Sequence, residues 1–246
     1  MVRLTLTEPR YLKDSIAIIS DLVNEARFKI NQDGLELIAM DPANVAMVVF
    51  KLLSPCFTEY NVPEPTEIAI NLANLKQVLR RVKPSDTLTL EYKDNRLVVL
   101  LRGDTTRTFS LPTIDLEEKE HRVPELSFPV KIKLGSHILV NAIEDADIVA
   151  DSVAFIAEPN RFTISAEGEL SAAKTEVTEK QAEIIAPEER TKAKYSIEYL
   201  KKMIGGAKLA DVATIQFNKD YPLKLEFKTV DRVLLSFILA PRIEND

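Results

Sequence analysis

The chain has 246 residues, of which 46% are hydrophobic and 28% charged, and 32 Lys and Arg oppose 38 Asp and Glu to give a net charge of −6. These proportions are typical of a globular protein that buries a core, and they exclude disordered and collagen-like chains. The longest apolar runs, 45–50 and 97–101, are far below the roughly 20 residues that a membrane span needs. An acidic chain is also at first sight a poor nucleic-acid binder, because that affinity depends on Lys and Arg.

The predicted elements follow one another in a regular order along the chain. Residues 1–9 alternate apolar and polar positions, which predicts a strand and argues against a signal peptide. Helical spacing then predicts a helix on Leu12, Ile16, Ile19 and Val23, and a second on Leu72, Leu75, Leu79 and Val82. Alternating runs at 67–71, 87–92, 96–101 and 107–111 predict strands with one buried face. Asp94-Asn95 and 218–220 are typical of hairpin turns.

The second half of the chain repeats the first. Phe28 and Phe155 lie 127 positions apart (155 − 28), and the neighbouring strand motifs 35–39 and 162–166 keep this offset. Further on, Asp86 and Asp211 lie 125 positions apart (211 − 86). The repeat predicts an α+β fold with two similar domains, each an antiparallel sheet with two helices on one face. We expect domains at 1–116 and 129–246, joined by a charged, proline-containing connecting loop at 117–128.

The residues that enzymes and metal sites use are scarce. Two histidines, His121 and His137, and one cysteine, Cys56, are too few for a metal site. No phosphate-binding glycine loop is present, so we expect no cofactor. Cys56 cannot form a disulfide within the chain, which favours a reducing intracellular compartment, and we expect it to be buried. A hydrolase using the carboxylates at 144–147 stays open as an alternative, although surface solvation explains acids more simply.

Basic residues are concentrated rather than spread. No acid occurs at 68–85, a segment that carries Lys76, Arg80, Arg81 and Lys83. Spacings of 4 and 3 place Lys76, Arg80 and Lys83 on one face of the predicted helix. Smaller basic faces are predicted at Arg10 and Lys13 and at Lys201 and Lys208. The predicted helix at 136–150 is the exception, because it carries Glu144, Asp145 and Asp147 and no Lys or Arg.

Five stretches resemble a known family. Residues 21–26 and 33–45, the tail at 221–227 and 239–244, and the connecting loop at 114–125 are similar to the DNA sliding clamps of archaea and eukaryotes, the proliferating cell nuclear antigen family. The sequence of residues 124–129, Pro-Glu-Leu-Ser-Phe-Pro, is similar to that of archaeal members. The resemblance covers essentially the whole chain in order.

The resemblance implies a DNA clamp fold that assembles as a trimeric ring around duplex DNA and increases polymerase processivity. The four helices of one chain, each about 10 Å wide, would line only about 40 Å of arc, whereas twelve would enclose a hole of roughly 28 Å. The implied partners are duplex DNA, held without sequence specificity, and DNA polymerase, clamp loader, ligase and flap nuclease. Two further clamp subunits, identical or paralogous, would complete the ring. The implied location is the cytoplasm with the archaeal nucleoid, or the nucleus in a eukaryote, with no membrane.

The resemblance also assigns residues to three surfaces. The hydrophobic pocket for partner peptides would comprise Met40, Val45, Val123, Pro124, Pro222, Ile238, Ala240 and Pro241. The DNA-facing cations would be Arg10, Lys13, Lys76, Arg80, Lys83, Lys201 and Lys208. The subunit interface would pair edge strands at 105–111 and 170–177 through main-chain bonds, with Arg107, Phe109, Leu111, Lys174 and Val177 as contacts.

Three positions depart from the family pattern. His121 replaces an apolar loop residue, Asn44 stands where relatives carry other polar residues, and the helix with Glu144 lacks cations. A like-charged helix beside DNA would repel it, or its charge would be supplied by non-identical subunits. The alternatives are a checkpoint-type clamp subunit, whose long phosphorylatable tail this sequence lacks after Pro241, a protein scaffold that never meets DNA, and the carboxylate enzyme.

Overall fold

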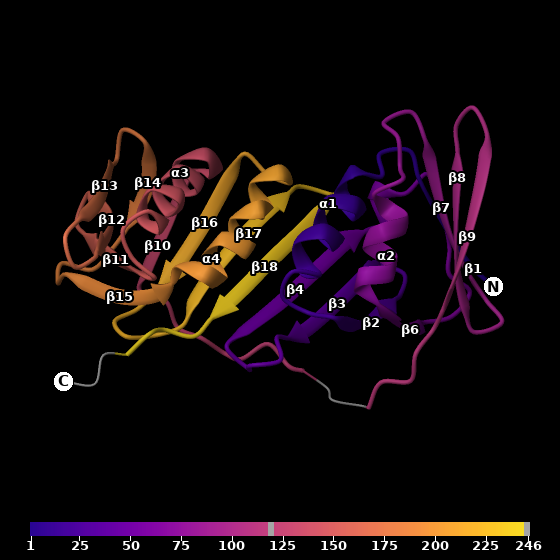
Figure 1. Ribbon diagram of the computed structural model, residues 1–246, viewed down its shortest axis with the longest axis horizontal. Helices are drawn as coiled ribbons and strands as arrows, with labels where there is room; N and C mark the ends of the chain where they lie inside the picture. The colour runs from indigo at the N-terminus through magenta and orange to yellow at the C-terminus, as the bar shows by residue number, and fades with distance from the viewer. Residues whose placement is uncertain (118–120, 244–246) are drawn as a thin grey trace. The chain divides into compact units, whose positions relative to one another are not determined.

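The computed structural model describes residues 1–117 and 121–243, and its chain divides into two compact units (Figure 1). The first unit comprises Met1–Pro42, Val48–Val123 and Thr229–Leu235, and the second comprises Ala43–Met47, Pro124–Lys228 and the residues from Ser236 onward. Residues 118–120 of the predicted connecting loop lie outside the described residues.

The first unit contains two sets of antiparallel strands and two helices. One set has the order β5-β1-β7-β8-β9, and the other has the order β4-β3-β2-β6. The helices are α1 (Arg10–Ile19) and α2 (Leu72–Leu79), and a short 3-10 helix covers Ser54–Cys56. The strands are β1 (Val2–Leu6), β2 (Glu25–Ile30), β3 (Gly34–Met40), β4 (Ala46–Leu53), β5 (Glu59–Asn61), β6 (Thr66–Asn71), β7 (Thr87–Lys93), β8 (Arg96–Arg102) and β9 (Thr106–Pro112).

The second unit has the same plan. Its sets have the orders β14-β10-β16-β17-β18 and β13-β12-β11-β15. The helices are α3 (Ser136–Asp147) and α4 (Ile197–Met203), and α4 continues as the 3-10 helix η2 (Ile204–Lys208). The strands are β10 (Val130–Gly135), β11 (Ser152–Glu158), β12 (Arg161–Glu167), β13 (Ala172–Thr178), β14 (Ala182–Ile185), β15 (Thr191–Ser196), β16 (Val212–Phe217), β17 (Leu223–Thr229) and β18 (Val233–Leu239).

The predicted repeat and fold class are confirmed, because each strand of the first unit has a counterpart with the same neighbours in the second. The pairing of β1 with β5 and β7, for example, recurs as the pairing of β10 with β14 and β16. The structure adds that the strands of each repeat divide into two sets. The helices of each unit contact one another, α1 with α2 and α3 with α4.

The predicted helices are real but shorter at their C-terminal ends. α2 begins at an Asn71 cap, whose side chain accepts a hydrogen bond from the Asn74 amide at 3.0 Å, and ends at Leu79. Lys83 therefore lies in a turn, and its predicted place on the helical face with Lys76 and Arg80 is wrong. The reason is Pro84, because a residue before proline is driven out of the helical conformation.

Both predicted hairpin turns are present. Asp94 and Asn95 have φ values of 51° and 57°, and Asp220 has 46°. Asn and Asp tolerate this left-handed conformation better than other side chains. Cys56 is buried, as predicted, and burial raises the pKa of its thiol, which makes it a packing residue. Within the described residues, no helix is long and apolar enough to cross a membrane.

The core of the second unit is built on aromatic side chains. Phe155 makes edge contacts with Phe162, Tyr195 and Phe217, with ring centroids 5.4 to 6.1 Å apart. The hydroxyl of Tyr195 donates a hydrogen bond to the carbonyl of Tyr221 at 2.7 Å, so its polar group is satisfied. On the neighbouring strand Phe227 is fully buried, and it packs directly against Gly206 of η2.

Substitution of Gly206 by alanine is expected to destabilise the second unit. A Cβ at this position would lie 2.2 Å from the ring of Phe227, and a fully buried ring cannot move away without disturbing its neighbours. We expect a loss of about 1–3 kcal/mol in the free energy of unfolding, measured by urea denaturation. Gly205→Ala is the matched control, because Gly205 is only half-buried, and an equal loss in both variants would contradict the proposed contact.

Candidate functional site

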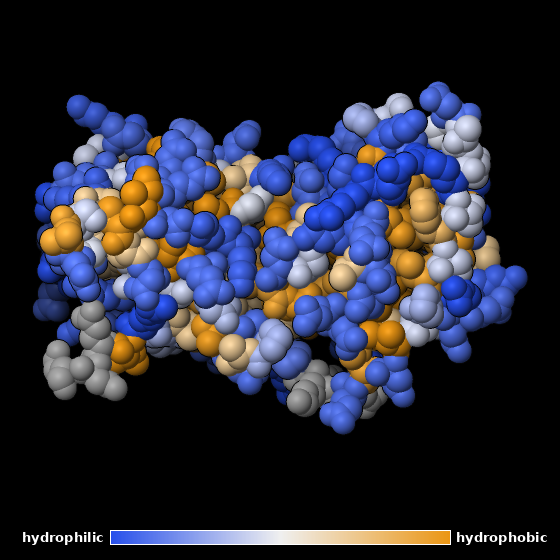
Figure 2. Space-filling model, viewed as in Figure 1, coloured by the Kyte–Doolittle hydropathy of each residue, from blue (hydrophilic) through white to orange (hydrophobic). Residues whose placement is uncertain are grey.

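The two helices of the first unit are joined by their polar side chains. Lys76 of α2 forms a 2.8 Å ion pair with Asp21, which follows α1. Lys13 of α1 donates a hydrogen bond to the carbonyl of Val82, after α2, at 3.3 Å. Two of the predicted DNA-facing cations therefore already have partners within the unit. The surface around both helices is predominantly hydrophilic (Figure 2).

The second unit repeats this ion pair. Lys201 of α4 lies 2.6 Å from Asp147, the last residue of α3. Lys76 and Lys201 are equivalent in the repeat, 125 positions apart, whereas the offset of 127 around Asp21 leads to Ile148, so the second unit makes a similar pair with the preceding residue, Asp147. The sequence pattern had suggested that Asp147 belongs to an uncompensated acidic cluster. The structure shows instead that Asp147 neutralises a cation, and of the three exposed acids of α3 only Glu144 and Asp145 have no ion pair within the described residues.

Other predicted cations have no ion pair within the described residues. Arg80 caps the C-terminus of α2 and is exposed, and so are Lys83 in the following turn and Lys208 at the end of η2. Arg10, the first residue of α1, stacks on the ring of Tyr11 at 4.3 Å and stays exposed. The residues that offer uncompensated positive charge are thus at the helix ends rather than along one helical stripe.

A buried carboxylate fixes the basic turn after α2. Asp86 is 2% exposed and accepts a 2.7 Å hydrogen bond from the backbone amide of Lys83. Arg107 of β9 forms an ion pair with Asp86 and donates to the carbonyl of Arg81 at 2.9 Å. The amide of Lys83, followed by the Arg107 guanidinium, holds the pKa of Asp86 below its usual range. Arg107, which the resemblance assigns to the subunit interface, therefore also has a partner inside its own unit.

Two long edge strands carry the other predicted interface residues. β9 ends its set and has no fully buried residue, with Phe109 and Leu111 half-buried. β13 ends its own set, with Lys174 exposed and Val177 buried, only 2% of its surface being exposed. Lys174 forms a 2.7 Å ion pair with Glu176 of the same strand. Both strands therefore present a main-chain edge of seven residues.

The first unit contains a large groove beside the connecting loop. It has a volume of about 1000 Å³ and runs along β2 and β3 on one side and the loop residues 115–117 and 121–123 on the other. Met40 and Val123, two of the predicted pocket residues, line it, and Val123 is 46% exposed. His121 lines the same groove. Its lining mixes apolar side chains such as Ile38 and Met40 with charged ones such as Arg27, and a groove of this composition suits an amphipathic peptide.

The other six predicted pocket residues belong to the second unit. The backbone amide of Ala240 donates to the carbonyl of Val45 at 2.9 Å, which brings two of them together. Ile238 is 9% exposed and offers little free surface, whereas Pro222 and Pro241 are half-buried and Pro124 is exposed. Arg242 anchors the end of the described chain through a 2.9 Å ion pair with Asp151.

Two further observations concern the backbone of Asn44 and the side chains that could bind a metal. Asn44 has a φ of 57°, so its backbone conformation gives a structural reason for asparagine at this position. Within residues 1–117 and 121–243, no group of three His, Cys, Asp or Glu side chains could hold a metal ion.

Two family models match the chain, one in each half. The family described as proliferating cell nuclear antigen, N-terminal domain, matches residues 1–120, and its C-terminal domain matches residues 122–242. The chain belongs to the proliferating cell nuclear antigen family. The family resemblance carried by residues 21–26, 33–45 and the tail, and the archaeal likeness of residues 124–129, are thereby confirmed.

Relatives within the family are similar over nearly their whole length. A protein of Pyrococcus furiosus, described as a DNA polymerase sliding clamp, is 40% identical over 229 residues, or 92% of both chains. A protein of Nanoarchaeum equitans with the same description is 35% identical over 98% of this chain and 99% of its own. A crystal structure of the proliferating cell nuclear antigen from Thermococcus kodakaraensis matches 98% of this chain and 100% of its own, with a TM-score of 0.92 and 31% identity.

Within this member of the proliferating cell nuclear antigen family, the Asp86 cluster is expected to make stability depend on pH. A carboxylate whose pKa is lowered by folding stabilises the protein above its unfolded pKa of about 3.9, and this stabilisation is lost as the pH falls through the folded value. We expect Asp86→Asn to destabilise the chain more at pH 7 than near pH 3 in urea denaturation. Asp211→Asn is the matched control, because Asp211 is exposed at the equivalent position. Equal pH dependence of the two variants would contradict this role.

Proposed function

We propose that this protein is a DNA sliding clamp, a processivity factor that encircles duplex DNA and tethers replication and repair enzymes. One observation carries the proposal: relatives described as DNA polymerase sliding clamps align with 92% or more of this chain and of their own length. The twofold repeat of the fold supports it, because a closed ring needs units of similar shape.

Duplex DNA would be held by local charge despite the net charge of −6. Arg80, Lys83 and Lys208 are the exposed cations that support this role, while Lys13, Lys76 and Lys201 have partners inside their units. Screening in physiological salt limits each charge to about 8–10 Å, so acids elsewhere on the surface do not cancel the attraction at the helices. DNA would be held through its phosphates, without sequence specificity.

The ring would consist of three chains joined head to tail. Strands β9 and β13 are suited to this contact, because each offers seven residues of main chain at an edge and β9 adds the half-buried side chains of Phe109 and Leu111. Pairing of one edge with a different edge on the next chain is a heterologous contact, and it closes into a ring when the rotation allows. Three identical chains would carry about −18 and still retain basic helix ends.

Enzymes would dock through a short peptide in the groove beside the connecting loop. The apolar residues Met40 and Val123 and the groove's volume of about 1000 Å³ suit one helical turn with an apolar anchor. DNA polymerase, clamp loader, ligase and flap nuclease are the proposed partners. The clamp itself would catalyse no reaction and hold no cofactor, and it would act in the cytoplasm at the archaeal chromosome.

The decisive experiment is to compare retention on DNA with and without free ends. After loading, the protein is expected to remain on a closed circular duplex in high salt and to leave a linear duplex by sliding off its ends. Gel filtration of labelled protein with each DNA measures this difference. Equal retention on both DNAs would contradict topological tethering and favour an ordinary DNA-binding protein or a scaffold.

The helix-end cations are expected to act in DNA retention but not in peptide binding. Arg80→Glu with Lys83→Glu should weaken retention on circular DNA, because it reverses two exposed charges. Binding of a partner peptide to the groove, measured by fluorescence anisotropy, should be unchanged. Loss of both activities together would contradict the separation of the two surfaces.

Removal of Asp21 is expected to strengthen DNA binding. Asp21→Asn frees Lys76 from its 2.8 Å ion pair and makes this cation available to a phosphate. We expect the slope of log K against log salt to become steeper by about 0.9, the change for one added phosphate contact. Asp104→Asn, which removes an exposed acid of a turn, is the control with the same change in net charge. The same gain in slope in both variants would mean that net charge, not Lys76, is responsible.

A further inference from the structure

One sheet face of the second unit is rich in lysine. Strands β10, β16 and β17 alternate buried and accessible residues, and the buried ones, such as Ile132, Ile215 and Leu225, form the core. The accessible residues line a shallow hollow of about 400 Å³: Lys131, Lys133, Val212, Thr214, Gln216, Lys224, Glu226 and Lys228. We call these eight residues the lysine face.

The lysines of this face stand in two rows. In the strand register, Lys131 lies opposite Gln216, which lies opposite Lys224 on the next strand. Lys133 lies opposite Thr214, which lies opposite Glu226, so the row on β17 has an acid between Lys224 and Lys228. Strands β10 and β17 are separated by β16, so the two rows are about 9.6 Å apart at their backbones. The hollow thus has cations on both sides and an uncharged floor on β16.

The positive charge of the face is only partly compensated. Lys133 pairs with Glu183 of β14 at 2.9 Å, and Lys224 pairs with Glu226 at 3.5 Å. Lys131 and Lys228 have no ion pair within the described part of the chain. This local excess of positive charge contrasts with the net charge of −6 of the whole chain.

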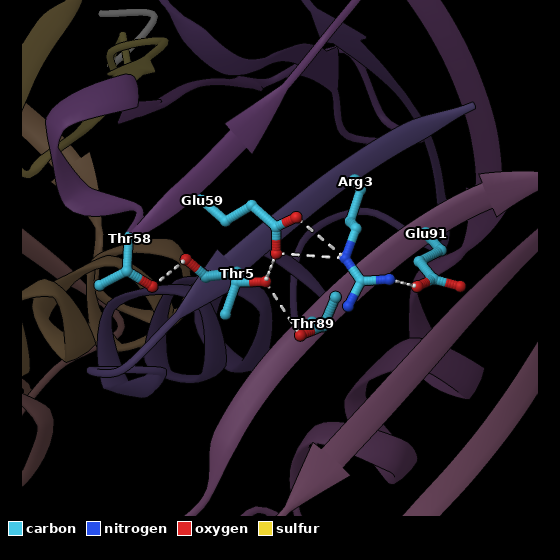
Figure 3. Close-up of polar contacts among 6 residues, drawn as sticks. All are labelled: Arg3, Thr5, Thr58, Glu59, Thr89 and Glu91. Atoms are coloured by element: carbon cyan, nitrogen blue, oxygen red, sulfur yellow. Dashed lines mark hydrogen bonds and ion pairs between the residues drawn. The ribbon is translucent and has the colours of Figure 1, made fainter.

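The equivalent face of the first unit does not carry this surplus (Figure 3). Arg3, the counterpart of Lys131, is held between Glu59 at 3.1 Å and Glu91 at 2.5 Å. Thr5, the counterpart of Lys133, donates to Glu59 at 2.9 Å and shares a hydrogen bond with Thr89. The Thr5 hydroxyl and then Arg3 hold the pKa of Glu59 below its usual range, so the acid remains ionised and neutralises the arginine.

The strand β8 completes the contrast. Where β17 carries Lys224 and Glu226, the register of β8 places Val98 and Leu100, both half-buried, and only the position of Lys228 keeps a cation, Arg102. The same fold therefore forms with a neutralised face in one unit and a lysine face in the other. Folding alone does not require the lysines, so their positive charge is available to an anionic partner.

We propose that the lysine face of the second unit binds an extended acidic segment of a partner protein, with carboxylates pairing to both lysine rows. In an extended chain, successive side chains point to opposite sides. Side chains on the same side are therefore about 6.8 Å apart. Lys131 and Lys133, two positions apart on one strand, have this same spacing. A run of Asp and Glu lying along β16 would present carboxylates to both rows at once.

The chemistry of the face favours a peptide over nucleic acid. No aromatic side chain lines the hollow, so it offers no platform for stacking the bases of a single strand. A single phosphodiester strand carries its charges along one line and would engage one row. The side chains of Thr214 and Gln216 can instead form hydrogen bonds with the peptide backbone on the floor.

The test uses the full-length protein and a fluorescein-labelled peptide of about eight consecutive Asp and Glu residues, long enough to cover a strand of this size. Anisotropy is measured at low salt for the wild type and for Lys131→Gln with Lys228→Gln, which removes no intramolecular ion pair. We expect roughly fivefold to tenfold weaker binding in the double variant, as for the loss of two exposed ion pairs. The same peptide with Asn and Gln should not bind.

The control is Lys93→Gln with Arg102→Gln, in which Lys93 loses a 3.8 Å ion pair with the exposed Asp94. It removes two charges from β7 and β8 of the first unit, and Arg102 is the counterpart of Lys228. We expect it to change peptide affinity less than twofold. Amide chemical-shift changes on adding peptide should lie in β10, β16 and β17.

Three results would overturn the proposal. The first is unchanged peptide affinity in the Lys131 and Lys228 variant. The second is an equal loss in the control variant, which would mean that only net charge matters. The third is that binding of a labelled oligonucleotide depends on Lys131 and Lys228 while binding of the acidic peptide does not. This result would assign the face to nucleic acid.

Discussion

The two-residue alternation of the antiparallel strands is the constraint on which the other features depend. In β10, β16 and β17 each buried apolar residue is followed by an accessible one, so the register between strands fixes what both faces display. A shift of one residue would bury the lysines and expose the core. The same alternation turns Phe227 toward the helical segment η2, where Gly206 leaves room for the ring. The core and the surface chemistry of a unit are therefore specified together.

Internal duplication let the two units keep this framework while their polar residues diverged. An ion pair joins the helices in both units, Asp21 with Lys76 and Asp147 with Lys201, although the two acids are one position apart in the repeat. The buried Asp86 with Arg107 was not, because Asp211 is exposed and Leu234 stands 127 positions after Arg107. Conserved positions within the repeat point to the needs of the fold, and divergent ones point to surfaces with separate tasks.

The distribution of charge matters more than its sum. Several cations that look available in the sequence are engaged inside their unit, while Arg80, Lys83 and Lys208 stay exposed at helix ends. An ion pair at the surface contributes little to stability, because solvent screens it, but it decides which side chains are free for a phosphate. The acidic helix α3 is also less repulsive than its composition suggests, since Asp147 is paired with Lys201.

The sequence by itself determined the repeat, the α+β class, the family and the approximate place of the helices and strands, because periodicity and motif order are local properties. It also indicated the burial of Cys56 and the hairpin turns. The division of each unit into two strand sets, the ends of the helices, the partners of Lys13, Lys76 and Lys201, and the two lysine rows were decided only by the tertiary structure. The physical reason is that each depends on residues far apart in the chain: Lys131 and Lys224 are 93 positions apart (224 − 131), and only the register of β10, β16 and β17 brings them to one face.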